Sequence, residues 1–164
     1  IEIDQPEQAG EDRLVNAAAV TALYKCNAIV VDFGTATNFD IVSAKGAYCG
    51  GAIAPGIGIA HDALVARAAK LHKIDLAPPP NPIGRNTIHA MQSGIFWGYA
   101  ALVEGMITRL KTAMQEADMG DGIRVIATGG LAPLFRQHTG VIDQIDPDLS
   151  LEWLRIIYTM KTGE

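Results

Sequence analysis

A mixed α/β fold, in which helices flank a sheet of antiparallel and parallel strands, is the expectation from this sequence. Short apolar runs rich in β-branched residues alternate with longer segments in which apolar residues recur every three or four positions. Three of the short runs follow one another before the first helical crossover, so the sheet is expected to start with three antiparallel strands. No GxGxxG turn follows the first strand, which disfavours a Rossmann domain.

The N-terminal part of the chain predicts one helix followed by the three strands. Good helix formers occupy Glu11–Lys25, and Asp12 lies where a cap or a first-turn acid belongs. Ala28–Phe33 is a nearly continuous apolar run, typical of a buried strand. Thr37–Ser43 alternates as a second strand, and a short glycine-containing turn leads into a third, Ala47–Ala54.

Two helices are predicted next, separated by a proline-rich segment at residues 77–82. The first follows Pro55-Gly56, and one of its faces carries Ile57, Ala60, Leu64 and Ala68. The second runs from Asn86-Thr87 to near Ala117 with a periodic apolar series: Ile88, Met91, Ile95, Tyr99, Leu102, Met106 and Leu110. Another backbone could approach this helix closely at three glycines: Gly94, Gly98 and Gly105.

The C-terminal part predicts a strand at Arg124–Thr128, a short helix at Ala132–Gln137, an edge strand at Val141–Ile145 and a helix at Leu151–Met160. Strands joined by helical crossovers indicate α/β layers. The antiparallel start of the sheet suits a ribonuclease-H-like core, the core of actin-type kinases.

The composition excludes several classes of protein. Hydrophobic residues make up 49% of the 164 residues, which is enough apolar surface to exclude a disordered chain. The formal net charge is −5 and Lys and Arg do not cluster, so no nucleic-acid partner is expected. The longest apolar run, Gly94–Val103, is about half the length that a bilayer requires, so no membrane partner is expected. Cys26 and Cys49 have no metal-ligand spacing, and the cytoplasm is the expected compartment.

The stretch from Asp32 to Thr37 is the most informative motif. An acid at the end of a buried strand, followed by Gly34 and Thr35, places a carboxylate, hydroxyls and backbone N–H groups around a tight turn. Such a turn can bind phosphate oxygens, and the carboxylate can hold a cation. The alternative is a plain hairpin whose polar side chains satisfy local backbone groups.

Two further motifs combine backbone freedom with charge. Thr128–Ala132 places Gly129 and Gly130 between a strand and a helix, where a base or a phosphate could come close, although ordinary loops have the same pattern. Gly10–Arg13 sets a carboxylate beside a guanidinium at a helix start. This pair is either a general base with an anion-binding partner, or a capping acid with a solvent-facing arginine.

Two motifs have small or polar residues at the start of a helix. Gly50–Gly56 lacks bulky polar side chains, which fits either a wall against a small substrate or a tight backbone crossing. Gly84–Thr87 supplies polar groups either to a ligand or to the cap of the long helix.

Five motifs in this order resemble the type III pantothenate kinases, also called the Bvg accessory factor family. They are GEDR, DFGTAT(x)FD, GGAIAPG, GRNT(x)(x)AMQSG and VIATGGLAPL, and they run from about Gly10 to the C-terminus. The resemblance implies a ribonuclease-H-like, actin-like ATPase domain. It also implies a kinase that phosphorylates the primary hydroxyl of pantothenate with ATP, giving 4′-phosphopantothenate, the first step of coenzyme A synthesis.

The resemblance also implies roles for single residues. Asp12 would accept the proton of the pantothenate hydroxyl, and Asp32 would bind a monovalent cation, either potassium or ammonium. Substrate contacts are expected at Gly10, Glu11, Asp12, Arg13 and Thr87. ATP, bound with Mg²⁺, is expected at Gly34, Thr35, Gly129 and Gly130.

One element of the family pattern, a D-x-G-N-[TS] phosphate loop that precedes these motifs, is not in this sequence. We therefore expect residues 1–27 to lead in from a preceding actin-like domain and residues 28–164 to form the second. The chain is expected to be a fragment that is inactive alone. The glycine-containing stripe of the long helix, together with the resemblance, predicts a homodimer.

Two other functions remain open at this point. A non-catalytic, transcription-accessory regulator of the same family would bind ATP without turnover. A related sugar or acetate kinase is disfavoured because GGAIAPG and GRNT belong to the pantothenate kinase pattern.

Overall fold

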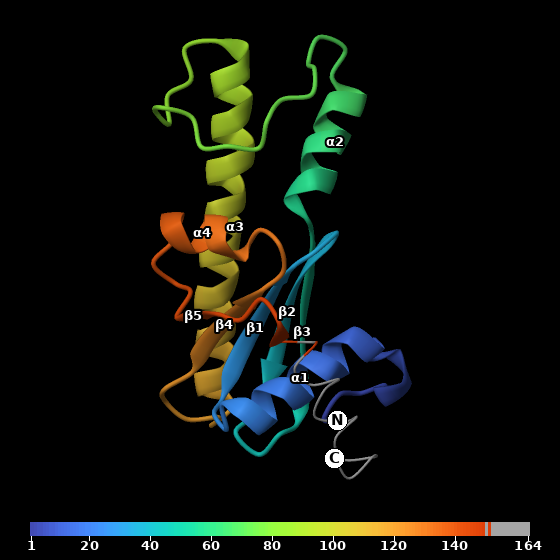
Figure 1. The fold of residues 1–164 in the computed structure, drawn as a ribbon. Coiled ribbons are helices and arrows are strands. Elements are labelled where there is room, and N and C mark those ends of the chain that lie inside the picture. The colour runs from blue at the N-terminus through green and yellow to red at the C-terminus, as the bar shows by residue number, and fades with distance from the viewer. Residues whose placement is uncertain (150, 152–164) are drawn as a thin grey trace.

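The computed structural model describes residues 1–149 and residue 151. In chain order its elements are η1 (Pro6–Gln8), α1 (Glu11–Leu23), β1 (Ala28–Phe33), β2 (Ala36–Val42), β3 (Tyr48–Pro55), α2 (Ile57–Arg67), α3 (Thr87–Glu116), β4 (Arg124–Thr128), α4 (Ala132–His138) and β5 (Gln144–Ile145) (Figure 1). Apart from Leu151, the helix predicted at Leu151–Met160 lies outside the described residues.

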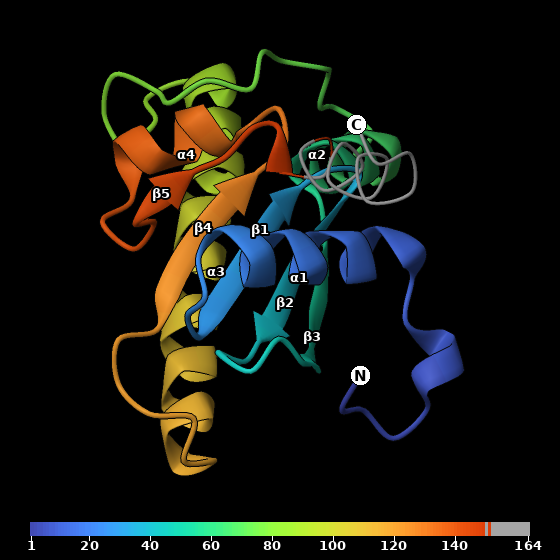
Figure 2. The ribbon, with the colours of Figure 1, turned by 60° about the horizontal axis from the view of Figure 1, so that its bottom comes forward.

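The five strands form one mixed sheet in the order β3-β2-β1-β4-β5. β2 pairs antiparallel with both β1 and β3, whereas β4 and β5 join the sheet in parallel. The prediction of a mixed α/β fold with an antiparallel three-strand start is confirmed. Because of these directions, the carboxyl ends of β1, β3 and β4 lie at one edge of the sheet (Figure 2).

α1 covers one face of the sheet and α3 covers the other (Figures 1 and 2). Val30 of β1 packs in one apolar cluster with Val20 of α1, and its neighbour Val31 packs in the other cluster with Val103 of α3. Both faces of β1 are therefore buried, which explains its unbroken run of apolar residues. Among the described residues, no helix has both the length and the apolar character needed to cross a membrane.

The core face of α3 differs from the periodic series that predicted the helix. Of that series only Met91 and Tyr99 are buried, and Ile88 is 57% exposed. The other buried residues lie on a neighbouring face: Phe96, Ala100, Val103, Ile107 and Met114. α3 is apolar over more than one face, and apolar periodicity alone does not say which face meets the sheet.

The face predicted for α2 is corrected in the same way. Ile57 and His61 are its buried residues, whereas Ala60 and Leu64 are exposed. The helix ends at Arg67, and Ala68 already has extended backbone angles. α2 continues from β3 beyond the sheet and runs beside the first half of α3, so little of its surface meets the core (Figure 1).

No backbone of the described residues approaches α3 at Gly94 or Gly98, because no heavy atom lies within 4 Å of a Cβ built on either. These two glycines therefore remain open. A close approach occurs at Gly51 in β3, where a Cβ would overlap the carbonyl oxygen of Phe39. For Gly51, a tight backbone crossing is therefore the correct interpretation.

Candidate active site

Three of the predicted motifs meet at the edge of the sheet where β1, β3 and β4 end. The N–H of Gly56, at the start of α2, donates to the carbonyl oxygen of Thr35 at 3.1 Å. Gly129, directly after β4, has φ +89°, and its backbone lies against that of Phe33. The Gly34-Thr35 turn is therefore held on both sides by neighbouring loops.

The loop after β4 is open on its outer side. Gly130 is exposed, and no heavy atom lies within 4 Å of a Cβ built on it. Thr128 is opposite Asp32 in the parallel register of β4 and β1. The loop thus leaves room for a ligand next to the acidic end of β1.

Asp12 lies in the first turn of α1, not at its cap. The N-cap is Gly10, and Glu11 and Asp12 follow it in the first turn. A Cβ on Gly10 would lie 2.6 Å from Oδ1 of Asp12, so the missing side chain at Gly10 makes room for this carboxylate. The structure therefore favours a first-turn acid, which the helix dipole stabilises, over a capping residue.

Arg13 is turned toward the sheet and away from solvent. Its side chain is 19% exposed, and Nε lies 3.8 Å from Oδ1 of Asp40, which is 1% exposed. Nη1 of Arg13 donates to the Tyr48 hydroxyl at 3.3 Å, and this hydroxyl donates to Oδ1 of Asp40 at 3.4 Å. The alternative of a solvent-facing arginine is wrong.

Two carboxylates lie between α1 and the sheet, the half-buried Asp32 and the buried Asp40, and the charge of the exposed Asp12 acts on both. Burial raises the pKa of Asp32; a hydrogen bond from Asn16 lowers it, and the charge of Asp12 raises it further. Burial also raises the pKa of Asp40, to about 6, against the opposing effects of Arg13 and the Tyr48 hydrogen bond. The site is thus rich in negative charge that is only partly compensated.

Sequence reasoning missed three residues of this site: Asn16, Asp40 and Tyr48. Asp40 is the last residue of the motif DFGTAT(x)FD, and the family resemblance implies no role for it. The signal was available in the strand periodicity, because alternate residues of a strand share a face. Asp40 is opposite Val30 and Asn38 is opposite Asp32, so these residues share the face that α1 covers.

The structure describes no ready-made metal centre. Within residues 1–149 and 151, no three His, Cys, Asp or Glu side chains are placed to hold one ion together. Asp32 alone still fits contact with a monovalent cation. Burial and the charge of Asp12 disfavour its ionised form, and a bound cation would offset both effects.

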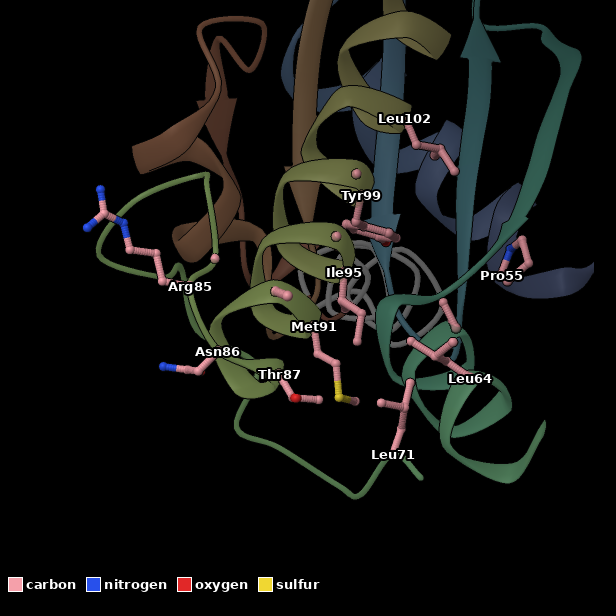
Figure 3. A pocket seen from close by; sticks show the side chains of 15 residues that line it. Pro55, Leu64, Leu71, Arg85, Asn86, Thr87, Met91, Ile95, Tyr99 and Leu102 are labelled. Atoms are coloured by element: carbon pink, nitrogen blue, oxygen red, sulfur yellow. The ribbon is translucent and has the colours of Figure 1, made fainter. Parts of the chain in front are cut away.

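Thr87, the remaining predicted contact, lies elsewhere. It is the first residue of α3, which begins at the end of the molecule far from α1 (Figure 1). Its side chain points into a groove of about 850 Å³ between α2 and α3, whereas the side chains of Arg85 and Asn86 point away (Figure 3). Asn86 caps the helix by accepting from the N–H of His89 at 2.8 Å.

The groove that Thr87 enters is mainly apolar. Its side chains come from both helices and from the segment between them, and include Leu64, Leu71, Met91, Ile95 and Leu102. The structure thus brings together Gly10–Arg13, Asp32, the Gly34-Thr35 turn and Gly129-Gly130, but it does not bring Thr87 to them within one chain.

Comparison with known proteins gives one consistent result. Residues 1–109 match a family model described as type III pantothenate kinase. A type III pantothenate kinase of Moorella thermoacetica is 54% identical over 162 residues, 99% of this chain and 62% of the relative. That of Streptomyces avermitilis is 53% identical over 156 residues, 95% of this chain and 58% of the relative. The chain therefore spans about three fifths of the length of these relatives.

A solved structure supports the fold. A Baf family protein of Campylobacter jejuni matches with a TM-score of 0.66 and 19% sequence identity. The match covers 100% of this chain and 70% of that protein. At this identity the likeness concerns the fold alone.

Proposed function

The chain belongs to the type III pantothenate kinase family, and from this we propose that the complete gene product transfers the γ-phosphoryl group of ATP to pantothenate. The acceptor is the primary hydroxyl, and the product is 4′-phosphopantothenate, the first intermediate on the way to coenzyme A. One observation supports this most: Asp12 is near enough to Asp32 for its charge to raise the pKa of Asp32, although burial is the larger cause. The proposed base would thus lie near the proposed phosphate-binding turn.

Asp12 is proposed as the proton acceptor. The acceptor hydroxyl oxygen forms a bond to the γ-phosphorus, the bond from that phosphorus to the β–γ bridging oxygen breaks, and ADP leaves. Asp12 takes the hydroxyl proton as the new bond forms. Phosphoryl transfer requires mainly positioning of the reactants and neutralisation of charge. One aligned carboxylate that acts as general base is therefore enough, and no covalent intermediate is needed.

The ATP phosphates are assigned to the Gly34-Thr35 turn, and the adenosine side to Gly129 and Gly130. Asp32 would hold a potassium or ammonium ion, which would supply positive charge beside the phosphates, and ATP would bind together with Mg²⁺. The exposed backbone of Gly130 supports the assignment, because a flat base needs an open approach.

A ribonuclease-H-like, actin-like fold is the finer assignment that we propose for residues 28–164, with residues 1–27 leading into it. The strand order β3-β2-β1-β4-β5, with three antiparallel strands first, supports it. The turn between β1 and β2 would then face the nucleotide. We also propose that the enzyme works in the cytoplasm, the compartment in which its proposed substrate ATP is found.

Thr87 is proposed to contact pantothenate across a homodimer. Within one chain it lies far from α1, in the open groove beside α2 (Figures 1 and 3). In the proposed symmetric dimer, Thr87 of one copy would contact pantothenate at the Asp12 of the other. Pantothenate, ATP and a second copy of the chain are therefore the proposed partners.

The test is ADP release by the complete gene product with ATP, Mg²⁺ and potassium, with and without pantothenate. We expect pantothenate-dependent ADP release and a product one phosphoryl group heavier by mass spectrometry. Pantoate and a hexose serve as alternative acceptors. ATP binding without turnover of any acceptor would overturn the kinase assignment and support a regulator.

A further inference from the structure

Arg13, Tyr48 and Asp40 form a set of hydrogen bonds whose directions are fixed. A guanidinium can only donate, so the Tyr48 oxygen accepts from Nη1 of Arg13. The single hydrogen of that hydroxyl is then left for Oδ1 of Asp40. Nε of Arg13 faces the same carboxylate oxygen. Nη1 is thus held by a hydrogen bond and Nε lies at ion-pair distance from the carboxylate, which restrains the plane of the group and directs Nη2 to another anion.

An irregularity in the sheet brings Tyr48 to Asp40. Asp40 is opposite Gly51, but Val42 is opposite Tyr48, so β3 carries one extra residue between these pairs. Gly50, within this stretch, has φ +91°. Such bulges re-aim side chains and are frequent next to active sites.

Stability does not explain why a carboxylate occupies position 40. Among the described residues, Oδ2 of Asp40 is buried without a hydrogen-bond partner. Burial raises the pKa of this carboxyl to about 6 even though Arg13 and Tyr48 are beside it. A buried ion pair of this kind contributes little to folding, because the loss of hydration offsets the attraction. The charge on Asp40 therefore has another use.

We propose that Asp40 and Tyr48 are positioning residues that hold the Arg13 guanidinium next to Asp12, oriented to bind the acceptor substrate. Both act through Arg13 and do not touch the substrate themselves. The inference rests on the proposed function, since it takes Gly10–Arg13 as the substrate-binding segment. It adds the two buried side chains that give this segment its geometry.

Steady-state kinetics of Asp40→Asn in the complete gene product tests the proposal. Asparagine keeps the shape and removes the charge. We expect the KM for pantothenate to rise about tenfold, the scale of a lost charged hydrogen bond, while kcat and the KM for ATP stay within about twofold. Tyr48→Phe should shift the same parameter in the same direction. A fall in kcat with an unchanged KM for pantothenate would overturn the proposal.

A matched control for Tyr48→Phe exists at the other end of α1, the helix that carries Arg13. The Tyr24 hydroxyl, at the C-terminal end of α1, donates to Oδ2 of Asp146 at 2.7 Å. Tyr24→Phe therefore removes a tyrosine–aspartate hydrogen bond of the same kind away from the site. It should leave the KM for pantothenate unchanged. An equal rise in both tyrosine variants would mean that general loosening of α1, not the position of Arg13, causes the effect.

A double-mutant cycle shows whether Asp40 acts through Arg13. In an Arg13→Lys background, in which the fork geometry is already lost, Asp40→Asn should raise the KM for pantothenate no further. If the two substitutions raised the KM for pantothenate by fully additive free energies, Asp40 would not act through Arg13 and the proposal would be overturned.

A spectroscopic measurement separates this proposal from the kinase assignment. The Nε–H resonance of Arg13, identified by its loss in Arg13→Lys, should be protected from exchange in the wild type and unprotected in Asp40→Asn. An unchanged resonance in Asp40→Asn overturns the positioning role. If the resonance changes but the wild type never phosphorylates pantothenate, the substrate assignment fails and the arginine geometry stands.

Discussion

Gly129 and Phe33 lie backbone against backbone: a Cβ on Gly129 would be 2.6 Å from the Phe33 carbonyl oxygen. Gly129 also has φ +89°, a conformation that side chains disfavour. The contact joins the loop after β4 to the end of β1, directly before the Gly34-Thr35 turn. Any residue larger than glycine at 129 must therefore separate the two loops that we assign to ATP.

Gly129→Ala should lower the free energy of unfolding by about 1–2 kcal/mol from the left-handed backbone alone, and by more from the overlap with Phe33. It should also raise the KM for ATP, because the two loops move apart. Urea unfolding and steady-state kinetics measure these effects. Gly140→Ala is the control, since no heavy atom lies within 4 Å of a Cβ there and its φ is not positive. Equal stability of both variants would contradict the close contact.

Asp12→Asn should lower kcat by roughly 10²–10⁴, the usual contribution of a positioned general base. Pantothenate binding, followed by calorimetry, should stay within a few-fold because the side chain keeps its size. Glu7→Gln, which removes an exposed carboxylate just before α1, is the control and should turn over normally. Near wild-type turnover in Asp12→Asn would leave Asp12 only a stabiliser of the helix start.

Asp32→Ala should abolish most of the activity together with its dependence on potassium or ammonium. The reason is that the substitution removes the carboxylate that we assign to the cation. Rates in potassium, ammonium, sodium and lithium chloride at equal ionic strength give the comparison. Asp121→Ala, in the exposed loop before β4, serves as control. An enzyme equally active in lithium and potassium would sink the cation assignment.

The charge of Asp40 predicts a pH dependence of stability. Its pKa is about 6 in the folded protein, above the ordinary value of 3.8, chiefly because of burial; Asp12 and Asp32 raise it, and Arg13 and Tyr48 oppose this. Between pH 3.8 and about pH 6, the folded state therefore binds more protons than the unfolded state. This contribution to stability is complete below about pH 4 and is lost as the pH rises through 6.

Above pH 6 the free energy of unfolding of Asp40→Asn should therefore exceed that of the wild type by roughly 1–3 kcal/mol. Near pH 4 this difference should disappear. Urea unfolding of both proteins from pH 4 to pH 8 checks this. Other carboxylates affect both proteins equally and cancel. A stability difference that does not change with pH would contradict the raised pKa. If Asp40→Asn is more stable than the wild type and also has a higher KM for pantothenate, then Asp40 serves substrate binding and not folding.

Subunit mixing tests the contact of Thr87 across the dimer. Asp12→Asn and Thr87→Val should each be strongly impaired alone. Refolded together, random pairing gives one intact site in about half of the dimers, so about a quarter of wild-type activity should return. No recovery would mean that Thr87 acts in its own chain or not at all.

Much of the fold could be predicted because its signals are local. β1 and β4 have the predicted limits, and β2 and β3 differ from theirs by one residue at each end. Their apolar runs, bounded by glycine or proline turns, are short-range patterns. The Gly34-Thr35 and Gly129-Gly130 loops could be predicted for the same reason, since each lies directly after a strand.

Tertiary packing decided what the sequence left open. The apolar surface of α3 offers two faces, and only contact with the sheet selects Phe96 and Val103 over Leu102. The inward turn of Arg13 depends on Asp40 and Tyr48, which are distant in sequence and meet through strand pairing and one extra residue in β3. Such long-range pairings have no local signature.

The exposed flank of α2 has a consequence for motion. Ile57 and His61, both near its start, are its buried residues, whereas Leu64 is 39% exposed. Segments with few buried apolar contacts open locally at a much lower free energy than the whole domain. Amide hydrogens in residues 62–67 should therefore exchange with deuterium far sooner than those of β1. The second half of α2 is therefore the part of this helix that we expect to unfold locally while the sheet stays intact.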